Sequence, residues 1–169
     1  ELVRRKRSAV CREINRLAQG IHLKGSNGEN LEIYYHEGGF NFRDLRGREA
    51  EKGLTLQGPH LDKVVINIDG REARISASYG QKRNAALSLK IAEIELIKEL
   101  KGQYPILLLD DIFLGLDESR QTEMISYLSK SPQVIFAFSD ASYLDQLPYA
   151  PSQIWKVDGG RVCGYDNTN

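Results

Sequence analysis

Four consecutive apolar residues, Ile106 to Leu109, follow Pro105 and are followed at once by two aspartates, Asp110 and Asp111. A continuous apolar run of this length is typical of a strand in a parallel sheet that helices cover on both faces. In such sheets, ligands bind beyond the carboxyl ends of the strands, which is where the two aspartates lie. The run therefore indicates an α/β fold and marks one end of the sheet as a candidate site.

The segments around this strand alternate between helical and strand patterns, which supports the same fold class. Gln81 to Lys101 is apolar around most of its circumference and predicts a largely buried helix. Four further elements are expected downstream: a helix at 118–129, a buried strand at 134–138, a short helix at 141–147, and a terminal hairpin formed by 154–157 and 162–165.

Upstream of the long helix, the patterns predict another helix and a β-hairpin. Leu2 to Leu17 carries apolar residues at helical spacing beside a basic face, and we expect this helix to end near Gly20. The β-branched run from Val64 to Ile68 should turn at Asp69-Gly70, a pair suited to a tight hairpin, and return over Ala73 to Ala77. Between these elements, we expect a strand at 31–35 and a loop at 37–53.

The composition limits the classes of protein that fit. The 169 residues, 41% of them hydrophobic, suffice for one ordinary domain with a core. Twenty-three basic residues balance 23 acidic ones, so DNA would have to be met by a local patch. Cys11 and Cys163 belong to no metal or disulfide motif, and no histidine lies at metal-ligand spacing; a reduced cytoplasm fits best. No apolar run reaches the roughly 20 residues that span a bilayer.

Ser78, Tyr79, Gly80 and Gln81 stand at the start of the long apolar helix. Free backbone N–H groups and the positive end of the helix dipole favour an anion at such a position. Ser78 adds a hydroxyl donor, and Gly80 permits close approach of the backbone. The same residues also fit a capping box, which satisfies the helix donors without any ligand. Taken alone, the pattern favours the capping box.

A carboxylate at the end of a buried parallel strand can hold Mg²⁺ or its water shell beside nucleotide phosphates, which is the role open to Asp110. Asp111 could orient or deprotonate an attacking water in the hydrolysis of a phosphoanhydride. An ordinary polar strand end explains either residue alone equally well. The order of the parts, from the anion-binding helix start through the paired aspartates to a Leu-Asp turn and Ser139, favours one nucleotide-dependent function.

Three stretches closely resemble the RecF family of bacterial recombination and repair proteins: Gly58-Pro59-His60, SYGQKRNAALSLKIAE at 78–93, and PILLLDDIFLGLD at 105–117. The resemblance implies the C-terminal part of an ABC-type P-loop ATPase head, related to the heads of SMC chromosome proteins. Parallel strands with flanking helices, a β-hairpin and an N-terminal helix are then expected. It also implies a helix and a remnant of the arm, or lobe II, at 1–57, and the signature and Walker B part of the head at 58–169.

The resemblance implies a role for each candidate residue. Ser78, Gly80 and Gln81 match the signature motif, which completes the nucleotide site of the opposing protomer at its γ-phosphate. Asp110 matches the Walker B aspartate that serves Mg²⁺, and Asp111 matches the catalytic carboxylate. Two further positions are the D-loop aspartate, Asp117, and the switch position, Ser139.

The chain also departs from the family pattern. Where family members commonly read Gly-Pro-His-Arg-Asp-Asp, the shared Gly-Pro-His is followed here by Leu61-Asp62-Lys63, and the connection from Tyr35 to Gly58 is short. The sequence contains no G-x-x-x-x-G-K-[ST], so the backbone cradle and lysine for the β- and γ-phosphates are absent from it. The family places that P-loop in an N-terminal segment. Binding of ATP and Mg²⁺, and ATPase activity, are therefore expected only together with such a segment.

The function implied by the resemblance is DNA repair and recombination. ATP would drive a homodimer that binds duplex DNA or single-strand/double-strand junctions and helps load recombinase at gaps and replication forks, with RecR and RecO as partners. Lys82, Arg83 and Lys90 are candidates for contacts with DNA phosphates, whereas the basic run from Arg4 to Arg7 fits a solvated helix face better. The alternative is a non-catalytic interaction module that docks RecR or a P-loop-bearing chain. A transporter ATPase subunit shares the motifs, but no membrane-coupling feature is visible.

Overall fold

The computed structural model describes residues 1–26, 28–39, 45–53, 55–56, 58–110, 118–140, 144, 147 and 149–164. Its elements, in chain order, are α1 (Leu2–Gly25), β1 (Leu31–His36), α2 (Leu45–Lys52), β2 (Lys63–Ile68), β3 (Arg71–Glu72), α3 (Ala73–Ser76), α4 (Tyr79–Lys101), β4 (Leu107–Asp110), α5 (Glu118–Leu128), β5 (Val134–Ala137), β6 (Trp155–Asp158) and β7 (Arg161–Gly164). None of the described helices is long and apolar enough to cross a membrane.

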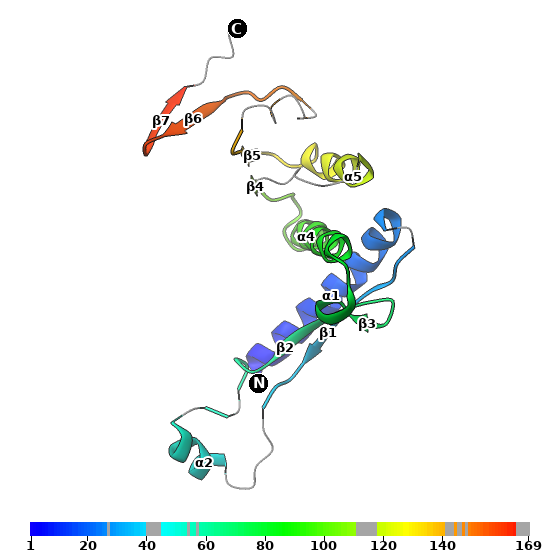
Figure 1. Ribbon diagram of the computed structural model, residues 1–169, viewed down its shortest axis with the longest axis vertical. Coiled ribbons are helices and arrows are strands. Elements are labelled where there is room, and N and C mark those ends of the chain that lie inside the picture. Colours follow the sequence, from blue (N-terminus) through cyan, green and yellow to red (C-terminus); the bar gives the residue numbers. More distant parts are fainter. Residues whose placement is uncertain are drawn as a thin grey trace.

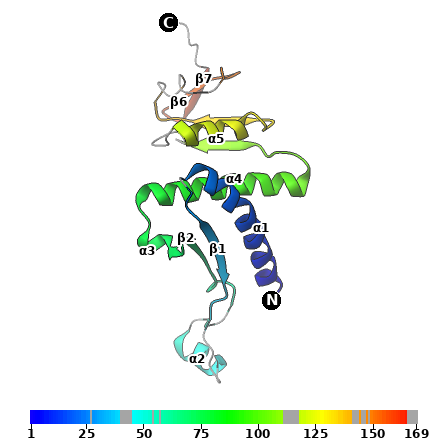
Figure 2. The same cartoon turned by 90° about the vertical axis from the view of Figure 1, so that its right-hand side faces the viewer.

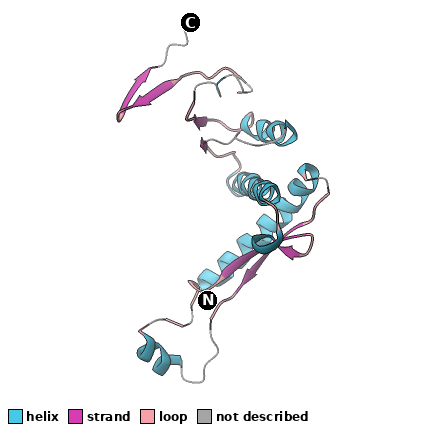
Figure 3. Cartoon of the chain, viewed as in Figure 1, coloured by secondary structure: helices cyan, strands magenta, loops and turns pink. Residues whose placement is uncertain are grey.

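The elements are stacked along the longest axis of the molecule (Figure 1). Helix α1 and the β1–β2 pair lie side by side, with α2 at their far end (Figure 2). From here on, the arm denotes these four elements, α1, β1, α2 and β2, which extend beyond residue 57 to Ile68. Helix α4 crosses the other end of the arm, and β4, β5 and α5 form the next layer beyond it. The β6–β7 hairpin lies at the end of the molecule that holds the C-terminus (Figure 3). The arm and the parallel strands thus lie on opposite sides of α4.

The arm is held by an apolar face of its sheet against α1. Strands β1 and β2 pair antiparallel, from Leu31 opposite Ile68 to His36 opposite Lys63, and Leu31 is fully buried in the core. The side chain of Asn15 in α1 accepts a hydrogen bond from the backbone N–H of Ile33 at 2.7 Å. This contact satisfies a donor on the edge strand that would otherwise be open to another chain.

Helix α4 is the centre of the core. Its apolar positions on nearly every side are explained by contacts with the arm below it and with the parallel strands above it. Ile91 and Ala92 are fully buried, and they belong to one cluster with Met124 and Leu128 of α5. The cluster also includes residues of α1, β1, β2 and β4. The long apolar helix predicted from the sequence is therefore confirmed.

The parallel pair predicted from the apolar runs is also present. Strands β4 and β5 pair in parallel, from Leu107 opposite Val134 to Asp110 opposite Ala137. Leu107 and Val134 face the core, whereas Leu108 is 75% exposed on the opposite face. The expectation of a strand covered on both faces is thus met on one face only among the described residues. Each of the two strands also has an outer edge that pairs with no described strand.

One helix limit and one loop prediction were wrong. Helix α1 continues through Gly20 to Gly25, because Ile21 and His22 pack into the core and this burial outweighs the low helix propensity of glycine. Within the stretch predicted as a loop, Leu45–Lys52 forms α2, whose residues are mostly good helix formers. The short helix predicted at 141–147 lies largely outside the described residues.

The hairpin prediction was right in its turn and wrong in its returning strand. Asp69 and Gly70 both have positive φ, at 49° and 75°, as a tight hairpin turn requires. Only Arg71–Glu72 pairs with β2, and the chain then forms the single helical turn α3. The terminal hairpin was predicted correctly and appears as β6 and β7.

The end of α4 gives a first test of the fold. Gly102 adopts the left-handed conformation, with φ at 77°, and caps the helix through its N–H. Gly102→Ala should lower the free energy of unfolding by about 1 kcal/mol, because a side chain is strained in this conformation. Gly20→Ala is the matched control: it lies inside α1 with open space around the new methyl group, and it should stabilise by roughly 0.5–1 kcal/mol. Urea denaturation of both variants measures the two shifts, and shifts of equal sign would contradict the helix limits.

Candidate functional site

The start of α4 forms the capping box that the sequence predicts. The backbone N–H of Gln81 donates to Ser78 Oγ at 3.2 Å, and the backbone N–H of Ser78 donates to Gln81 Oε1 at 2.9 Å. Capping does not use up the donors at this end of the helix. The hydroxyl proton of Ser78 is still available, and the N–H groups of Tyr79 and Gly80 have no acceptor within the helix.

The start of α4 is exposed and has open space beside its backbone, which suits an anionic ligand. Ser78, Tyr79 and Gly80 are all exposed. A methyl group built at Gly80 would meet no atom nearer than Ser78 Oγ at 4.0 Å, so the backbone is open to a close approach. A capping box and an anion site are therefore compatible here, because the box fixes the loop and leaves donors that point outward.

Gln81 makes one contact that was not predicted from the sequence. Its Nε2 donates to Glu29 Oε1 at 2.7 Å, and Glu29 Oε2 lies 3.5 Å from His22 Nε2. These partners are separated from Gln81 by 52 and 59 residues of sequence. No local pattern could have identified them, since each contact depends on how α1 packs against α4.

Asp110 and Ser139 lie at the same end of the parallel sheet. Asp110 is the last residue of β4 and pairs with Ala137, the last residue of β5, so Ser139 follows two residues later at that end. Both side chains belong to exposed residues. The other two predicted residues of this group, Asp111 and Asp117, lie outside the described residues.

The topology brings the end of β4 to the same side of the molecule as the start of α4. Helix α4 runs in one direction, the chain turns at Gly102, and β4 runs back along the helix (Figure 2). The carboxyl end of β4 and the amino end of α4 therefore face the same side. Asp110, at the end of β4, and Ser78, at the start of α4, are therefore both exposed on that side of the molecule.

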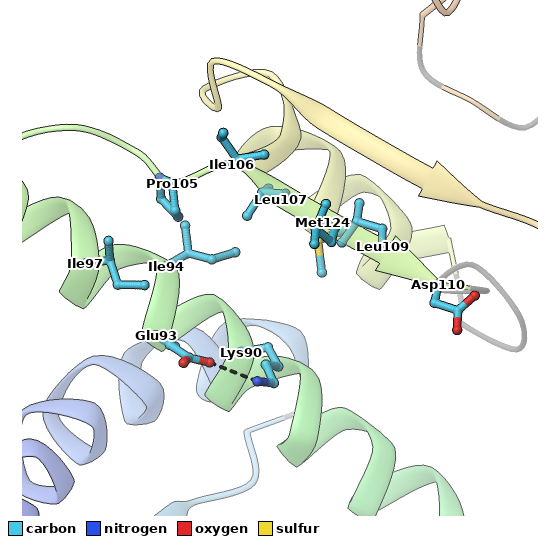
Figure 4. Close-up of a pocket in the computed structure, with 11 residues that line it drawn as sticks. Lys90, Glu93, Ile94, Ile97, Pro105, Ile106, Leu107, Leu109, Asp110 and Met124 are labelled. Atoms are coloured by element: carbon cyan, nitrogen blue, oxygen red, sulfur yellow. Dashed lines mark hydrogen bonds and ion pairs between the residues drawn. The ribbon is translucent and has the colours of Figure 1, made fainter. Parts of the chain in front are cut away.

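An apolar pocket of about 370 Å³ lies between α4 and β4 (Figure 4). Four successive residues of β4 contribute to its wall, so the pocket follows the edge of the strand that β5 does not occupy. Asp110 lies at one end of the pocket, and the ion pair of Lys90 with Glu93, whose charged atoms are 2.9 Å apart, lies on α4. The lining is mostly apolar and does not suit a nucleotide.

The candidate DNA-binding residues of α4 are largely engaged within the chain. Lys82 Nζ donates to the carbonyl oxygen of Arg74 at 3.1 Å, and Lys90 pairs with Glu93. Arg83 is half-buried. Since exposed lysine contacts are weak, Lys82 and Lys90 could exchange their partners for phosphate.

Part of the basic run in α1 has a structural role that a solvated face does not explain. Arg4 forms two hydrogen bonds with Asp62, at 2.8 and 3.1 Å, and a third with the carbonyl oxygen of Gly38 at 2.7 Å. Asp62 also accepts from the hydroxyl of Tyr35 and from the N–H of Gly38. We call Arg4, Tyr35, Gly38 and Asp62 the arm clasp, because they tie α1 to the loops at the end of β1 and the start of β2.

The arm clasp is tightly packed and strongly charged. The side chain of Asp62 is only 1% exposed. Burial alone would raise the pKa of this carboxyl group, but the hydrogen bonds from Arg4, Tyr35 and Gly38 outweigh it and lower the pKa to about 2. A methyl group at Gly38 would lie 1.9 Å from the carbonyl oxygen of Leu61, so only glycine fits there. Asp62, which lies in the Leu61-Asp62-Lys63 stretch that differs from the common family pattern, is thus a structural residue of the arm.

Proteins of similar sequence are RecF proteins. The chain is 35% identical over 158 residues to the DNA replication and repair protein RecF of Bacillus pumilus (strain SAFR-032), covering 90% of this chain and 42% of that protein. It is 34% identical over 174 residues to the RecF protein of Bacillus subtilis (strain 168), covering 93% and 47%. The chain therefore spans about half the length of the curated relatives it matches. No protein-family model matches the chain.

Solved structures give the same relationship. The structure of the recombination mediator protein RecF with ATP, in the RecFOR pathway, matches with a TM-score of 0.74 and 25% identity over 96% of this chain and 46% of that one. An Smc head domain from Pyrococcus yayanosii matches with a TM-score of 0.50 and 16% identity over 92% of this chain and 27% of that one, which concerns the fold alone. The fold is thus that of RecF and SMC-type ATPase heads.

Proposed function

The chain belongs to the RecF family, in which it corresponds to the C-terminal half, and from this we propose that it is part of an ATP-dependent DNA repair and recombination factor. In this proposal, the chain supplies the signature, Walker B and D-loop groups of an ABC-type ATPase head. A segment with a P-loop supplies the remaining groups. ATP then holds two protomers together head to tail, with the signature motif of each closing the nucleotide site of the other.

One observation carries the proposal. The open donors at the start of α4 and the carboxylate at the end of β4 are exposed on the same side of the molecule. The outer edges of β4 and β5 have no neighbouring strand among the described residues. Among the described residues, the parallel sheet has only two strands and is covered on one face, which is less than an ordinary α/β domain has. An incomplete sheet with a pocket along one strand edge suits a chain that shares its sheet with a P-loop segment.

The residues present suit a nucleoside triphosphate and Mg²⁺. Ser78 and the N–H groups of Tyr79 and Gly80 can donate to the terminal phosphate of a nucleotide that the opposing protomer holds. Asp110, a hard oxygen ligand at the strand end, can hold Mg²⁺ directly or through water. When bound, the metal ion would neutralise phosphate charge. Asp111 would orient the attacking water, Asp117 would contact the partner protomer, and Ser139 would lie beside the terminal phosphate.

The DNA-related part of the proposal rests on the family. The solved relative is a recombination mediator of the RecFOR pathway, so we assign DNA, RecR and RecO as partners and recombinase loading as the purpose of the closed dimer. Hydrolysis would reopen the dimer and release DNA. Lys82, Arg83 and Lys90 remain the proposed DNA contacts of this chain, with Lys82 and Lys90 exchanging their internal partners for phosphate.

Ser78→Ala tests the proposed role of the signature. In the protein assembled with its P-loop segment, this change should weaken ATP-driven dimerisation by about ten-fold, because one donor to the phosphate and the helix cap are lost together. Ser76→Ala is the matched control, since its exposed hydroxyl only donates to the carbonyl oxygen of Glu72. Analytical ultracentrifugation with and without ATP gives the two dimerisation constants. Equal constants for both variants would refute the assignment.

A further inference from the structure

The contacts of Gln81 beyond the capping box point to a residue outside the family motifs. We propose that Glu29, in the turn between α1 and β1, is a positioning residue for the signature motif. It fixes the side-chain amide of Gln81, and through it the orientation of Ser78 toward the nucleotide. This inference rests on the proposed function, because it concerns how the signature donors are aligned.

The side-chain amide of Gln81 has one favoured orientation. Its oxygen accepts from the backbone N–H of Ser78 at 2.9 Å, and its nitrogen donates to Glu29 Oε1 at 2.7 Å. A carboxylate can only accept hydrogen bonds, so Glu29 requires the NH₂ group on its side. Flipping the amide would place its NH₂ against the N–H of Ser78 and its oxygen against the carboxylate. Glu29 therefore selects the one orientation that completes the capping box.

Glu29 also lies beside a buried side chain of α1. Its other oxygen lies 3.5 Å from Nε2 of His22, which is fully buried in the last turn of α1. His22 Nδ1 lies 3.0 Å from the hydroxyl of Ser88, and Ser88 donates to the carbonyl oxygen of Asn84 at 2.9 Å. Ser88 is also fully buried. Glu29 is only 24% exposed, so solvent weakens these contacts little.

This chain of contacts joins the turn after α1 to helix α4. It starts at the exposed end of α4, passes through the turn after α1, and returns to α4 within the core. The end of the arm and the start of the signature helix are thereby joined by side chains that prefer one arrangement. Buried polar contacts of this kind specify geometry more than they add stability. A fixed geometry is what Glu29 needs in order to orient the phosphate donors at the start of α4.

The test exchanges the two side chains of the central contact. In the protein assembled with its P-loop segment, Gln81→Glu opposes two carboxylates and should weaken ATP-driven dimerisation and lower kcat by at least about ten-fold. The double variant with Glu29→Gln and Gln81→Glu restores a carboxylate–amide pair, and it should recover to within about three-fold of the unaltered protein. Nucleotide affinity of the separate protomer should stay unchanged in both, because the signature acts on the partner's nucleotide.

Glu99→Gln is the matched control, because Glu99 also joins α4 to α1, through Arg16 at 2.9 Å, but near the other end of the helix. It should change neither kcat nor dimerisation. A double variant as defective as Gln81→Glu alone would overturn the positioning role. If Ser78→Ala also leaves dimerisation unchanged, the proposed function itself fails. If Ser78→Ala is defective and the exchange shows no coupling, only the inference about Glu29 fails.

Discussion

Asp110→Asn is expected to reduce ATP turnover by at least about 100-fold in the protein assembled with its P-loop segment, and to abolish ATP-driven dimerisation. A neutral amide cannot offset the charge of Mg²⁺, and the loss of one hard anionic ligand weakens the metal site. Asp110 is exposed at the end of β4, so the isosteric change should leave the fold intact. Steady-state phosphate release, together with a melting curve for each protein, separates chemistry from stability.

The control for this prediction is Asp158→Asn. Asp158 ends the exposed strand β6 and makes a loose ion pair with Lys156, at 3.8 Å. It should turn over ATP at the unaltered rate. Turnover that persists in Asp110→Asn at half the normal rate or more would remove Asp110 from the metal site, and would leave the strand end as an ordinary polar terminus.

The second large effect is expected far from the nucleotide, in the arm clasp. Asp62→Ala leaves the guanidinium of Arg4, the hydroxyl of Tyr35 and the N–H of Gly38 without their shared acceptor in a buried place. We expect the melting temperature to fall on the order of 10 °C. Glu93→Gln breaks an exposed pair on α4 and should shift the melting temperature by less than about 2 °C. Similar shifts in the two variants would show that the clasp contributes nothing beyond a surface ion pair.

The clasp also predicts a pH dependence. Folding lowers the pKa of Asp62 from its ordinary value of 3.8 to about 2, so the folded state binds fewer protons than the unfolded state between these values. The stability due to this carboxylate is therefore complete above about pH 4 and is lost as the pH falls toward 2. The difference in melting temperature between the unaltered chain and Asp62→Asn should stay constant from pH 7 to 5 and shrink below pH 4. A difference that grows on acidification would contradict the assigned direction.

Elements with a strong local pattern could be predicted from the sequence. The long helix, the parallel strands and the Asp69-Gly70 turn each follow from spacing, burial pattern or backbone preference, and the structure confirms them. The capping box could be read from two residues for the same reason, since both partners belong to one helical turn. For Ser78, the sequence offered capping and anion binding as alternatives, and the geometry makes them compatible.

What could not be predicted depends on contacts between distant segments. The extension of α1 past Gly20 follows from packing of Ile21 against the core, which no local propensity reveals. The Arg4–Asp62 pair spans 58 residues of sequence, so the basic run could only be assigned a solvated face. Glu29 carries no motif at all, and its contact with Gln81 exists only because the turn after α1 lies beside the start of α4. Such residues become visible when the topology is known.

The central claim is that the signature of this chain acts on a nucleotide held by the opposite protomer. The most direct measurement mixes two proteins that are each defective in ATP turnover: one carries Ser78→Ala, and the other carries a P-loop segment whose phosphate-binding lysine is replaced. A mixed dimer then contains one site with both groups intact, so ATP turnover should rise on mixing, up to roughly half the normal rate per active dimer. Turnover that stays at the level of the separate proteins across all mixing ratios would contradict a site shared between two subunits.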